Sequence, residues 1–326
     1  MQRRPLLSAT ASAVALGSMT RLARAQGAWP SKPIRIVVGY PAGGLTDGLA
    51  RAYGEYMATK LGQPVVIDNR AGAAGMLAGG EVAKAAADGH TLWFTLSSTL
   101  AQNRVLFKKM PYDPDKDFIH VAGFSSGPLP MAVPLASPVK TFSDLLALAR
   151  KQRITLGNYA AGSYPQMLAQ HMTSRMGAEV EPVPYKGEAP MWLDVVSGQL
   201  TAGQGSVLGV MAHLQAARVR AIAVSTLNRS PLLPDVPTFV EQGFTEPVFT
   251  VEGWLGLFAP AGTPREIVQR MSDLVQEGAS SPRVQQLNKT FGMPDKPWSA
   301  AEFERVDGQI KPIWINLARE LNITLD

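Results

Sequence analysis

The stretch VVGYPAGGLTD, from Val37 to Asp47, joins an apolar run to a proline, two adjacent glycines, a threonine and an aspartate. The apolar run begins at Ile34, and its near-continuous apolar character is typical of a strand that is buried on both faces. Beyond Asp47, apolar residues between Leu49 and Met57 fall on one stripe of a helix, and charged residues fall on the opposite side. The stretch is therefore predicted to be the turn from the carboxyl end of a strand into a helix.

The same alternation of strands and helices continues along most of the chain. Further strands are predicted at residues 65–67, 91–96, 131–133, 154–156, 180–183, 200–202, 221–224 and 254–258. Helices are predicted at residues 76–87, 142–151, 166–176, 191–197 and 207–215, and three more begin near residues 264, 282 and 300. This order predicts the α/β class, and the first block predicts a parallel sheet covered by helices on both faces.

Local signals mark the ends of several helices. Gly62 is predicted to end the first helix. Thr141, with Asp144 three residues later, is a variant of the capping box. Thr263 precedes Pro264 and is predicted to cap the helix that follows.

The glycine-containing turn is a candidate anion site, because ligands of open α/β sheets bind at the carboxyl ends of the strands. Gly43 and Gly44 let backbone N–H groups approach a ligand without an intervening Cβ. The helix that begins near Leu45 or Thr46 adds the positive end of its dipole. A carboxylate fits this site better than a nucleotide, because dinucleotide and P-loop motifs are absent and Asp47 would repel a phosphate. The alternative is a tight turn that binds no ligand.

The first 25 residues have the features of a cleaved secretory signal. A basic start is followed by an uncharged run from Pro5 to Thr20 and then by Ala23-Arg24-Ala25, which predicts cleavage after Ala25. The pair Arg3-Arg4 leaves both the Sec and the twin-arginine export routes open. A membrane anchor is the alternative, but the run is short and weakly apolar. The predicted location is periplasmic, and the 301 of 326 residues that remain predict two domains.

Charge and cysteine content argue against several functions. The first 25 residues hold four arginines and no acidic residue, so 27 of the 31 basic residues remain beside all 26 acidic residues. A nearly neutral mature chain gives no electrostatic reason to expect a nucleic acid or an anionic membrane surface as partner. No later segment approaches the length of a membrane span, so no stable membrane insertion is expected. The absence of cysteine excludes disulfides, cysteine nucleophiles and thiolate metal sites.

The sequence shows no catalytic or metal-binding constellation. The histidines are scattered without metal-ligand spacing, at His90, His120, His171 and His213. The serine within Gly203–Gly209 lacks the neighbours that a nucleophile elbow requires. The six tryptophans are spread along the chain and are interpreted as packing residues. We therefore predict no catalytic residue, no metal and no cofactor.

A series of short motifs spans the chain from Trp29 to the C-terminus. The motifs are WPSKPI at 29–34, PAGGLTD at 41–47, LGQPVV at 61–66, DGHTL at 88–92, PYDP at 111–114, PYKG at 184–187, RSP at 229–231 with PT at 237–238, and GLFAPAGTP at 256–264. Each motif is weak alone, but their fixed order is specific. In this order the chain resembles the periplasmic solute receptors of tripartite tricarboxylate transporters, often called Bug receptors.

The resemblance implies a two-lobed, Venus-flytrap fold of the type II periplasmic binding proteins, in which the chain crosses twice between the lobes. After a signal at residues 1–25, lobe I would comprise residues 26–123 and 253–326, and lobe II residues 124–252. The resemblance also implies a monomer that holds a small carboxylate solute between the lobes. That solute would be delivered to the membrane permease subunits of a tripartite transporter.

The resemblance further implies which residues hold the solute. The loop at 41–47 would bind a carboxylate through backbone groups and ordered water, a serine-rich turn would face it, and a turn at 161–164 would come from the second lobe. The expected ligand-binding residues are Tyr40, Gly43, Gly44, Leu45, Thr46, Asp47, Ser97, Ser98, Gly162, Ser163, Tyr164, Gly205 and Ser206.

The chain departs from the pattern of the resembled family in two places. Met167 stands where many members carry a histidine, and Thr201 and Gly205 stand where many carry the aspartates of a Gly-Gln-Val-Asp-x-x-x-Asp segment. The missing acid would remove either a repulsion toward a second carboxylate or a partner for an ammonium group. An enzyme (a hydrolase or lyase) or a ligand sensor on the same scaffold is the alternative function. No catalytic pair supports the enzyme, and the sequence does not separate the sensor from the transport receptor.

Overall fold

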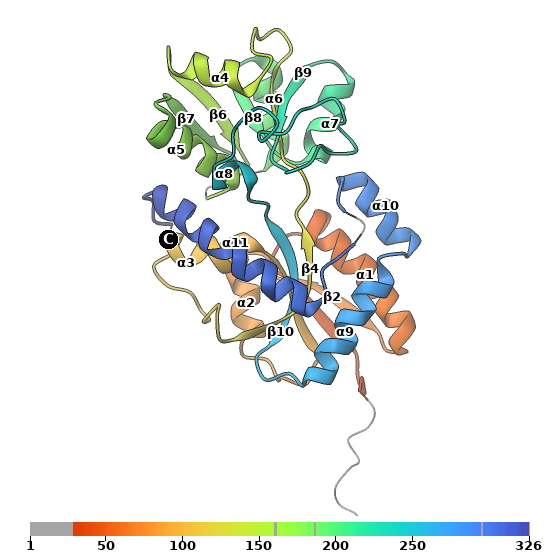
Figure 1. Cartoon of the computed structure of the whole chain (residues 1–326). Helices are drawn as coiled ribbons and strands as arrows, with labels where there is room; N and C mark the ends of the chain where they lie inside the picture. The colour runs from red at the N-terminus through yellow and green to blue at the C-terminus, as the bar shows by residue number, and fades with distance from the viewer. Residues whose placement is uncertain (1–28, 160–161, 186, 295, 326) are drawn as a thin grey trace, which may run out of the picture.

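The computed structural model describes residues 29–159, 162–185, 187–294 and 296–325, and these residues form two five-stranded sheets. The sheets belong to two bodies, one above the other in Figure 1, connected by the segments that leave β4 and enter β10. No helix in the described ranges is long and apolar enough to cross a membrane. The predicted signal at residues 1–25 lies outside the described residues.

The first sheet has the strand order β2-β1-β3-β10-β4. Its strands are β1 (Ile34–Val38), β2 (Val65–Asn69), β3 (Thr91–Leu96), β4 (Phe118–Ser125) and β10 (Trp254–Pro260). β1 pairs in parallel with β2 and β3, as predicted. β10 runs antiparallel to both β3 and β4, so the parallel arrangement predicted for the first block holds for β1, β2 and β3 and does not extend to the whole sheet. Because β4 leads out toward the second body and β10 returns from it, these neighbours run in opposite directions.

The second sheet has the strand order β7-β6-β8-β5-β9. Its strands are β5 (Pro130–Pro134), β6 (Ile154–Asn158), β7 (Val180–Pro184), β8 (Ala202–Gln204) and β9 (Val219–Val224). β6 pairs in parallel with β7 and β8, whereas β5 runs antiparallel to β8 and β9. Both sheets are therefore mixed, and the predicted α/β class is confirmed.

Helices cover both sheets. They are α1 (Leu45–Leu61), α2 (Met76–Val82), α3 (Asn103–Leu106), α4 (Phe142–Ala149), α5 (Tyr164–Met176), α6 (Glu188–Ser197), α7 (Val207–Gln215), α8 (Pro247–Thr250), α9 (Arg265–Gly278), α10 (Pro282–Phe291) and α11 (Ala300–Glu320). Gly62 ends α1 in the left-handed conformation, and Thr141 and Asp144 form the predicted capping box of α4. The predicted cap at Thr263 is wrong, because its hydroxyl donates to the carbonyl of Pro260 at 2.8 Å.

The C-terminal helix α11 contacts both bodies. Near its start, Phe303 is fully buried beside Trp254, with ring centroids 5.0 Å apart, and belongs to a core cluster of the first sheet. Near its end, Trp314 lies edge-on to Tyr164 at 5.9 Å, within the main core cluster of the second sheet. Figure 1 shows α11 running along the boundary between the two bodies. This helix therefore forms one wall of the space between the sheets.

Candidate ligand-binding cleft

A cavity of about 410 Å³ lies between the two sheets. Its first-sheet side comes from Tyr40 after β1 and from the turn after β3, which includes Ser97 and Ser98. Its second-sheet side comes from the start of α5, and the crossing into β10 and the end of α11 complete it. A cavity of this size is within the usual range for small-molecule sites.

The cavity brings together six of the residues that were predicted to bind the solute. These are Tyr40, Ser97, Ser98, Gly162, Ser163 and Tyr164. The other seven lie outside its lining, and they are Gly43, Gly44, Leu45, Thr46, Asp47, Gly205 and Ser206. The predicted residues are therefore divided between a lining set and two neighbouring loops.

The glycine loop is exposed and is organised by one carboxylate. Gly43 adopts a φ of +90°, and its N–H donates to Oδ2 of Asp47 at 2.9 Å. Asp47 also forms an ion pair with Arg51 at 2.9 Å. Burial would raise the pKa of Asp47, but the hydrogen bonds from Arg51 and Gly43 outweigh it, and the pKa is lowered. The Gly43 N–H is thus used within the loop, and the contact of Gly43 with a solute stays a prediction.

The first turn of α1 keeps donors available. Gly44 is the N-cap residue and offers no side-chain cap. In the part of the chain that the structure describes, no hydrogen bond to the N–H groups of Leu45 or Thr46 is present. These two N–H groups lie at the positive end of a 17-residue helix and remain available to an anion.

The serine turn after β3 is more ordered than a simple turn. Residues Ser98–Gln102 form a single π-helical turn that leads into α3. The hydroxyls of Tyr40 and Thr99 are 2.6 Å apart, and Tyr112 donates to the carbonyl of Thr99 at 3.0 Å. Burial raises the pKa of Tyr40, which keeps its hydroxyl protonated. The turn therefore presents Ser97 and Ser98 to the cavity on a hydrogen-bonded support.

On the side of the second sheet, the cavity is lined by the residues at the start of α5. Ser163 is the N-cap of α5, and its hydroxyl lies 3.4 Å from Oδ1 of Asn158. Gly162, at a φ of +74°, donates its N–H to Gln166 at 2.7 Å. Tyr164 donates to the carbonyl of Val248 at 2.8 Å, and burial raises its pKa. Ser163 thus offers a hydroxyl opposite the serine turn.

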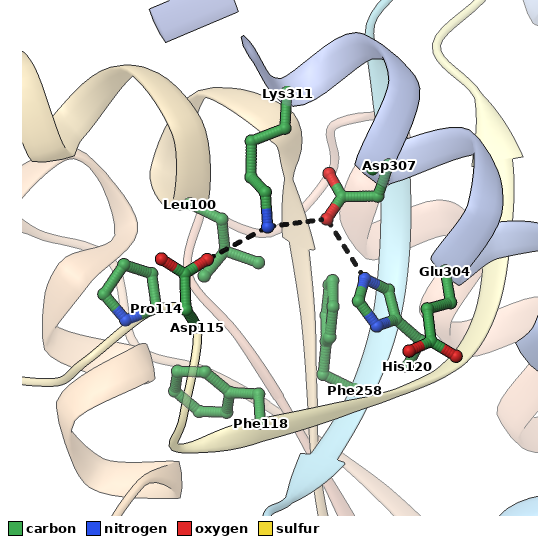
Figure 2. A pocket seen from close by; sticks show the side chains of 10 residues that line it. Leu100, Pro114, Asp115, Phe118, His120, Phe258, Glu304, Asp307 and Lys311 are labelled. Carbon is green, nitrogen blue, oxygen red and sulfur yellow. Dashed lines mark hydrogen bonds and ion pairs between the residues drawn. The ribbon is translucent and has the colours of Figure 1, made fainter.

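Trp254 lines the cavity and is anchored from behind. Its indole N–H donates to Oδ1 of the buried Asp307 at 3.0 Å. The other oxygen of Asp307 pairs with His120 at 3.1 Å and with Lys311 at 3.5 Å, and Lys311 also reaches Asp115 at 3.0 Å. Figure 2 shows Lys311 between the two aspartates in a pocket of about 280 Å³. This polar network holds the ring of Trp254 in one orientation.

The loop before α7 has a structural role. Ser206 donates its hydroxyl to Glu188 at 2.7 Å and its N–H to the same carboxylate at 2.8 Å. The hydroxyl also accepts from the N–H of Gly209 at 3.1 Å, as an N-cap does. A Cβ on Gly205 would lie 3.0 Å from Glu188. The carboxylate of Glu188 therefore occupies the space beside Gly205, where an aspartate was noted as missing.

Sequence reasoning did not single out the other twelve lining residues of the cavity. Gln102, Trp254, Trp314 and Leu325 are among them. The tryptophans were interpreted as packing residues, and both are also buried. Within the described ranges no group of three or more His, Cys, Asp or Glu residues is arranged to hold a metal ion.

A family model described as the tripartite tricarboxylate transporter family receptor matches residues 49–309. The chain belongs to this family. The predicted resemblance is thus confirmed, and the family consists of receptors and not of enzymes. Membership in a family of receptors argues against the alternative of a hydrolase or lyase on the same scaffold.

Relatives of known sequence or structure agree with this assignment. A UPF0065 protein from the tcbD–tcbE intergenic region of Pseudomonas sp. strain P51 is 36% identical over 284 residues, which cover 86% of this chain and 84% of the relative. Protein BugT of Bordetella pertussis is 33% identical, with 78% and 79% covered. The R. palustris protein Rpa4515, whose structure contains adipate, is 30% identical with a TM-score of 0.76, and the match covers 91% of this chain and 99% of that one.

We expect Ser206→Ala to lower the free energy of unfolding by about 1 kcal/mol, because it removes a hydroxyl that caps α7. Ser281→Ala is the matched control. Ser281 is the N-cap of α10 but makes no side-chain capping bond, and its buried hydroxyl has no partner among the described residues. The control should therefore change the free energy of unfolding by only about 0.3 kcal/mol. Urea denaturation measures the free energy of unfolding of both variants. An equal decrease in Ser206→Ala and Ser281→Ala would contradict the capping role of Ser206.

Proposed function

We propose that this chain is an extracytoplasmic receptor that binds a small carboxylate solute between its two sheets and delivers it to the membrane permease subunits of a tripartite transporter. The observation that carries the proposal is the cavity of about 410 Å³, to which both sheets contribute polar groups. Family membership supports the role in transport, and the adipate in a related structure supports a carboxylate as the solute.

The proposed lobes nearly coincide with the two sheets. Lobe I comprises residues 26–123 and 253–326, and lobe II comprises residues 124–252, so that Phe124 and Ser125, the last two residues of β4, fall in lobe II although they pair with β10 in the first sheet. The crossings are adjacent, because Ser126 donates its N–H to the carbonyl of Gly253 at 3.0 Å, just beyond the paired ends of β4 and β10. The end of α11 belongs to lobe I but packs with the core of the second sheet. When the lobes close, this end of the helix would therefore shift against lobe II.

Neutral groups hold the carboxylate in this proposal. Among the described residues that line the cavity there is no lysine, arginine, histidine, aspartate or glutamate. The hydroxyls of Ser97 and Ser98 supply donors within the cavity, and those of Tyr40 and Ser163, which donate to Thr99 and Asn158, can still accept a hydrogen bond there. Leu45 and Thr46 lie at the start of α1, shortly after the cavity residue Tyr40. When a bound ligand favours a conformation in which the two lobes are closer together, their free N–H groups also bind the carboxylate.

The proposal includes export. A signal at residues 1–25 would be removed, so the mature protein recovered from the periplasm should begin at or near Gln26, as intact-mass measurement would show. This location gives the receptor access to solutes outside the cytoplasm. Recovery of the full-length chain from the cytosol, or of an intact chain anchored in the membrane, would contradict the proposed location.

The Gly44→Val variant tests whether the glycine loop at residues 41–47 contributes to the binding of the carboxylate. Gly44 has φ −85° and ψ 178°, and a Cβ there meets no atom within 4 Å, so the variant should fold. The new side chain would obstruct the N–H groups that follow it. Charge-assisted hydrogen bonds are worth about 1.5–3 kcal/mol each, so calorimetry should show at least about a tenfold loss of affinity.

The ligand for this measurement is the carboxylate that gives the largest thermal shift in a screen of carboxylic acids. Thr46→Ala is the control, because it removes only a hydroxyl and should cost about 1 kcal/mol or less. A Gly44→Val protein with the circular dichroism and the affinity of the wild type would show that the loop is only a turn.

A further inference from the structure

The two crossing segments between the sheets have one face toward the solute cavity and one face away from it. Ser126 and Gly253 line the cavity, and the N–H of Ser126 donates to the carbonyl of Gly253 at 3.0 Å. Their chain neighbours Ser125 and Glu252 line a second pocket, of about 280 Å³. Because alternate residues of an extended chain point to opposite faces, this second pocket, the rear pocket, lies behind the crossings.

Both bodies contribute to the rear pocket. The loop at 226–231, which follows β9, comes from the body of the second sheet, and residues 292–294, which follow α10, come from that of the first. A Cβ added to Gly292 would lie 3.0 Å from Cδ1 of Leu232, so the two residues touch. This meeting of Leu232 with Gly292 is the rear contact. Beside it α10 approaches α7 of the second body, just above it in Figure 1.

The loop that carries Leu232 is braced by hydrogen bonds. Arg229 binds both carboxylate oxygens of Glu241, at 3.0 and 2.9 Å, and also donates to the carbonyl of Pro234 at 3.0 Å. The hydroxyl of the buried Ser230 accepts from the N–H of Leu232 at 3.3 Å. A rotation of the second body therefore carries Leu232 with it.

Glu252 connects the crossings to the same loop. Its carboxylate accepts a hydrogen bond from the hydroxyl of Ser125 at 3.1 Å and another from the backbone N–H of Leu227. One side chain thus joins the end of β4, the segment that enters β10 and the loop after β9. The crossings and the loop form one connected unit on the rear face.

A rotation about the crossings acts in opposite directions on their two faces. When the lobes approach each other across the cavity, the segments behind the crossings move apart. Residues 41–44 of the glycine loop are exposed and lie outside the cavity lining, as expected of an arrangement that is not fully closed. Further closure would therefore separate Leu232 from Gly292.

We propose that the rear contact of Leu232 with Gly292 holds the lobes apart and thereby sets the affinity for the solute, although neither residue lines the cavity. Part of the binding free energy of the solute is used to separate this contact, because apparent affinity falls with the fraction of molecules that are able to close. This inference rests on the proposed function, since it assumes that the lobes close on a carboxylate.

An engineered disulfide across the rear contact tests the inference in a chain that has no cysteine of its own. Cγ of Leu232 lies 3.5 Å from the position of a Cβ on residue 292, so a cysteine sulfur at position 232 can reach a partner there. In the double variant Leu232→Cys/Gly292→Cys, the oxidised form should bind the carboxylate chosen by thermal shift at least about tenfold more weakly than the reduced form.

The reduced form of the same protein is the matched reference for this measurement. Gly292 has a φ of +67°, so a cysteine there strains the end of α10 equally in both forms. Mass spectrometry verifies the cross-link, and calorimetry measures both affinities. Equal affinities of the cross-linked and the reduced protein would overturn the inference.

Leu232→Ala tests the rear contact without a cross-link. The variant should bind the same carboxylate about three- to fivefold more tightly than the wild type, because less apolar contact opposes closure. Without ligand it should also be more compact in X-ray scattering. Val236→Ala is the control, since Val236 packs against the same buried cluster as Leu232 but is not among the nearest neighbours of residue 292.

The outcomes separate this inference from the proposed function. If the wild type binds a carboxylate and Leu232→Ala matches Val236→Ala in affinity and in radius of gyration, the inference is wrong and the carboxylate receptor stands. If no member of a broad carboxylate screen binds the wild type, the proposed function fails. The scattering of the two unliganded variants then still decides whether the rear contact holds the lobes apart.

Discussion

The antiparallel pairing of β4 with β10 is the constraint on which the rest of the molecule depends. The two strands pair from Ser125 and Trp254 at one end to Phe118 and Pro260 at the other, with one register shift. Because the chain leaves the first sheet through β4 and returns through β10, both connections to the second sheet emerge from one edge. The cavity lies at that edge, and Trp254, the first residue of β10, lines it.

Helix α11 adds a second connection between the bodies. Its first half packs on the first sheet through Phe303, and its last turns pack with the second sheet through Trp314. The backbone N–H of Leu325 then donates to the carbonyl of Leu106 at 2.6 Å, which brings the C-terminal segment to the side of the cavity. One helix thus positions a wall of the cleft, and through Asp307 it also fixes Trp254.

The sequence predicts the local elements well because each depends on nearby residues. The boundaries of β1 and β3 and the capping box at Thr141 follow from apolar runs and caps within a few positions. Strand β4 is not predicted, because His120 and Gly123 interrupt its apolar run and its place depends on β10. The same limit applies to the cleft. Trp314 and Gln102 line one cavity only because α11 packs against the π-helical turn, which lies more than 200 residues earlier in the chain.

The central claim is that one solute contacts both sheets at once, and hydrogen exchange measures this directly. With and without a saturating carboxylate chosen by thermal shift, exchange would be followed in peptides that cover the serine turn at 97–102 and the start of α5 at 163–167. The account predicts that both segments become protected together, since the same ligand lies between them. Protection of only one segment, or of residues remote from both, would contradict a binding site between the sheets.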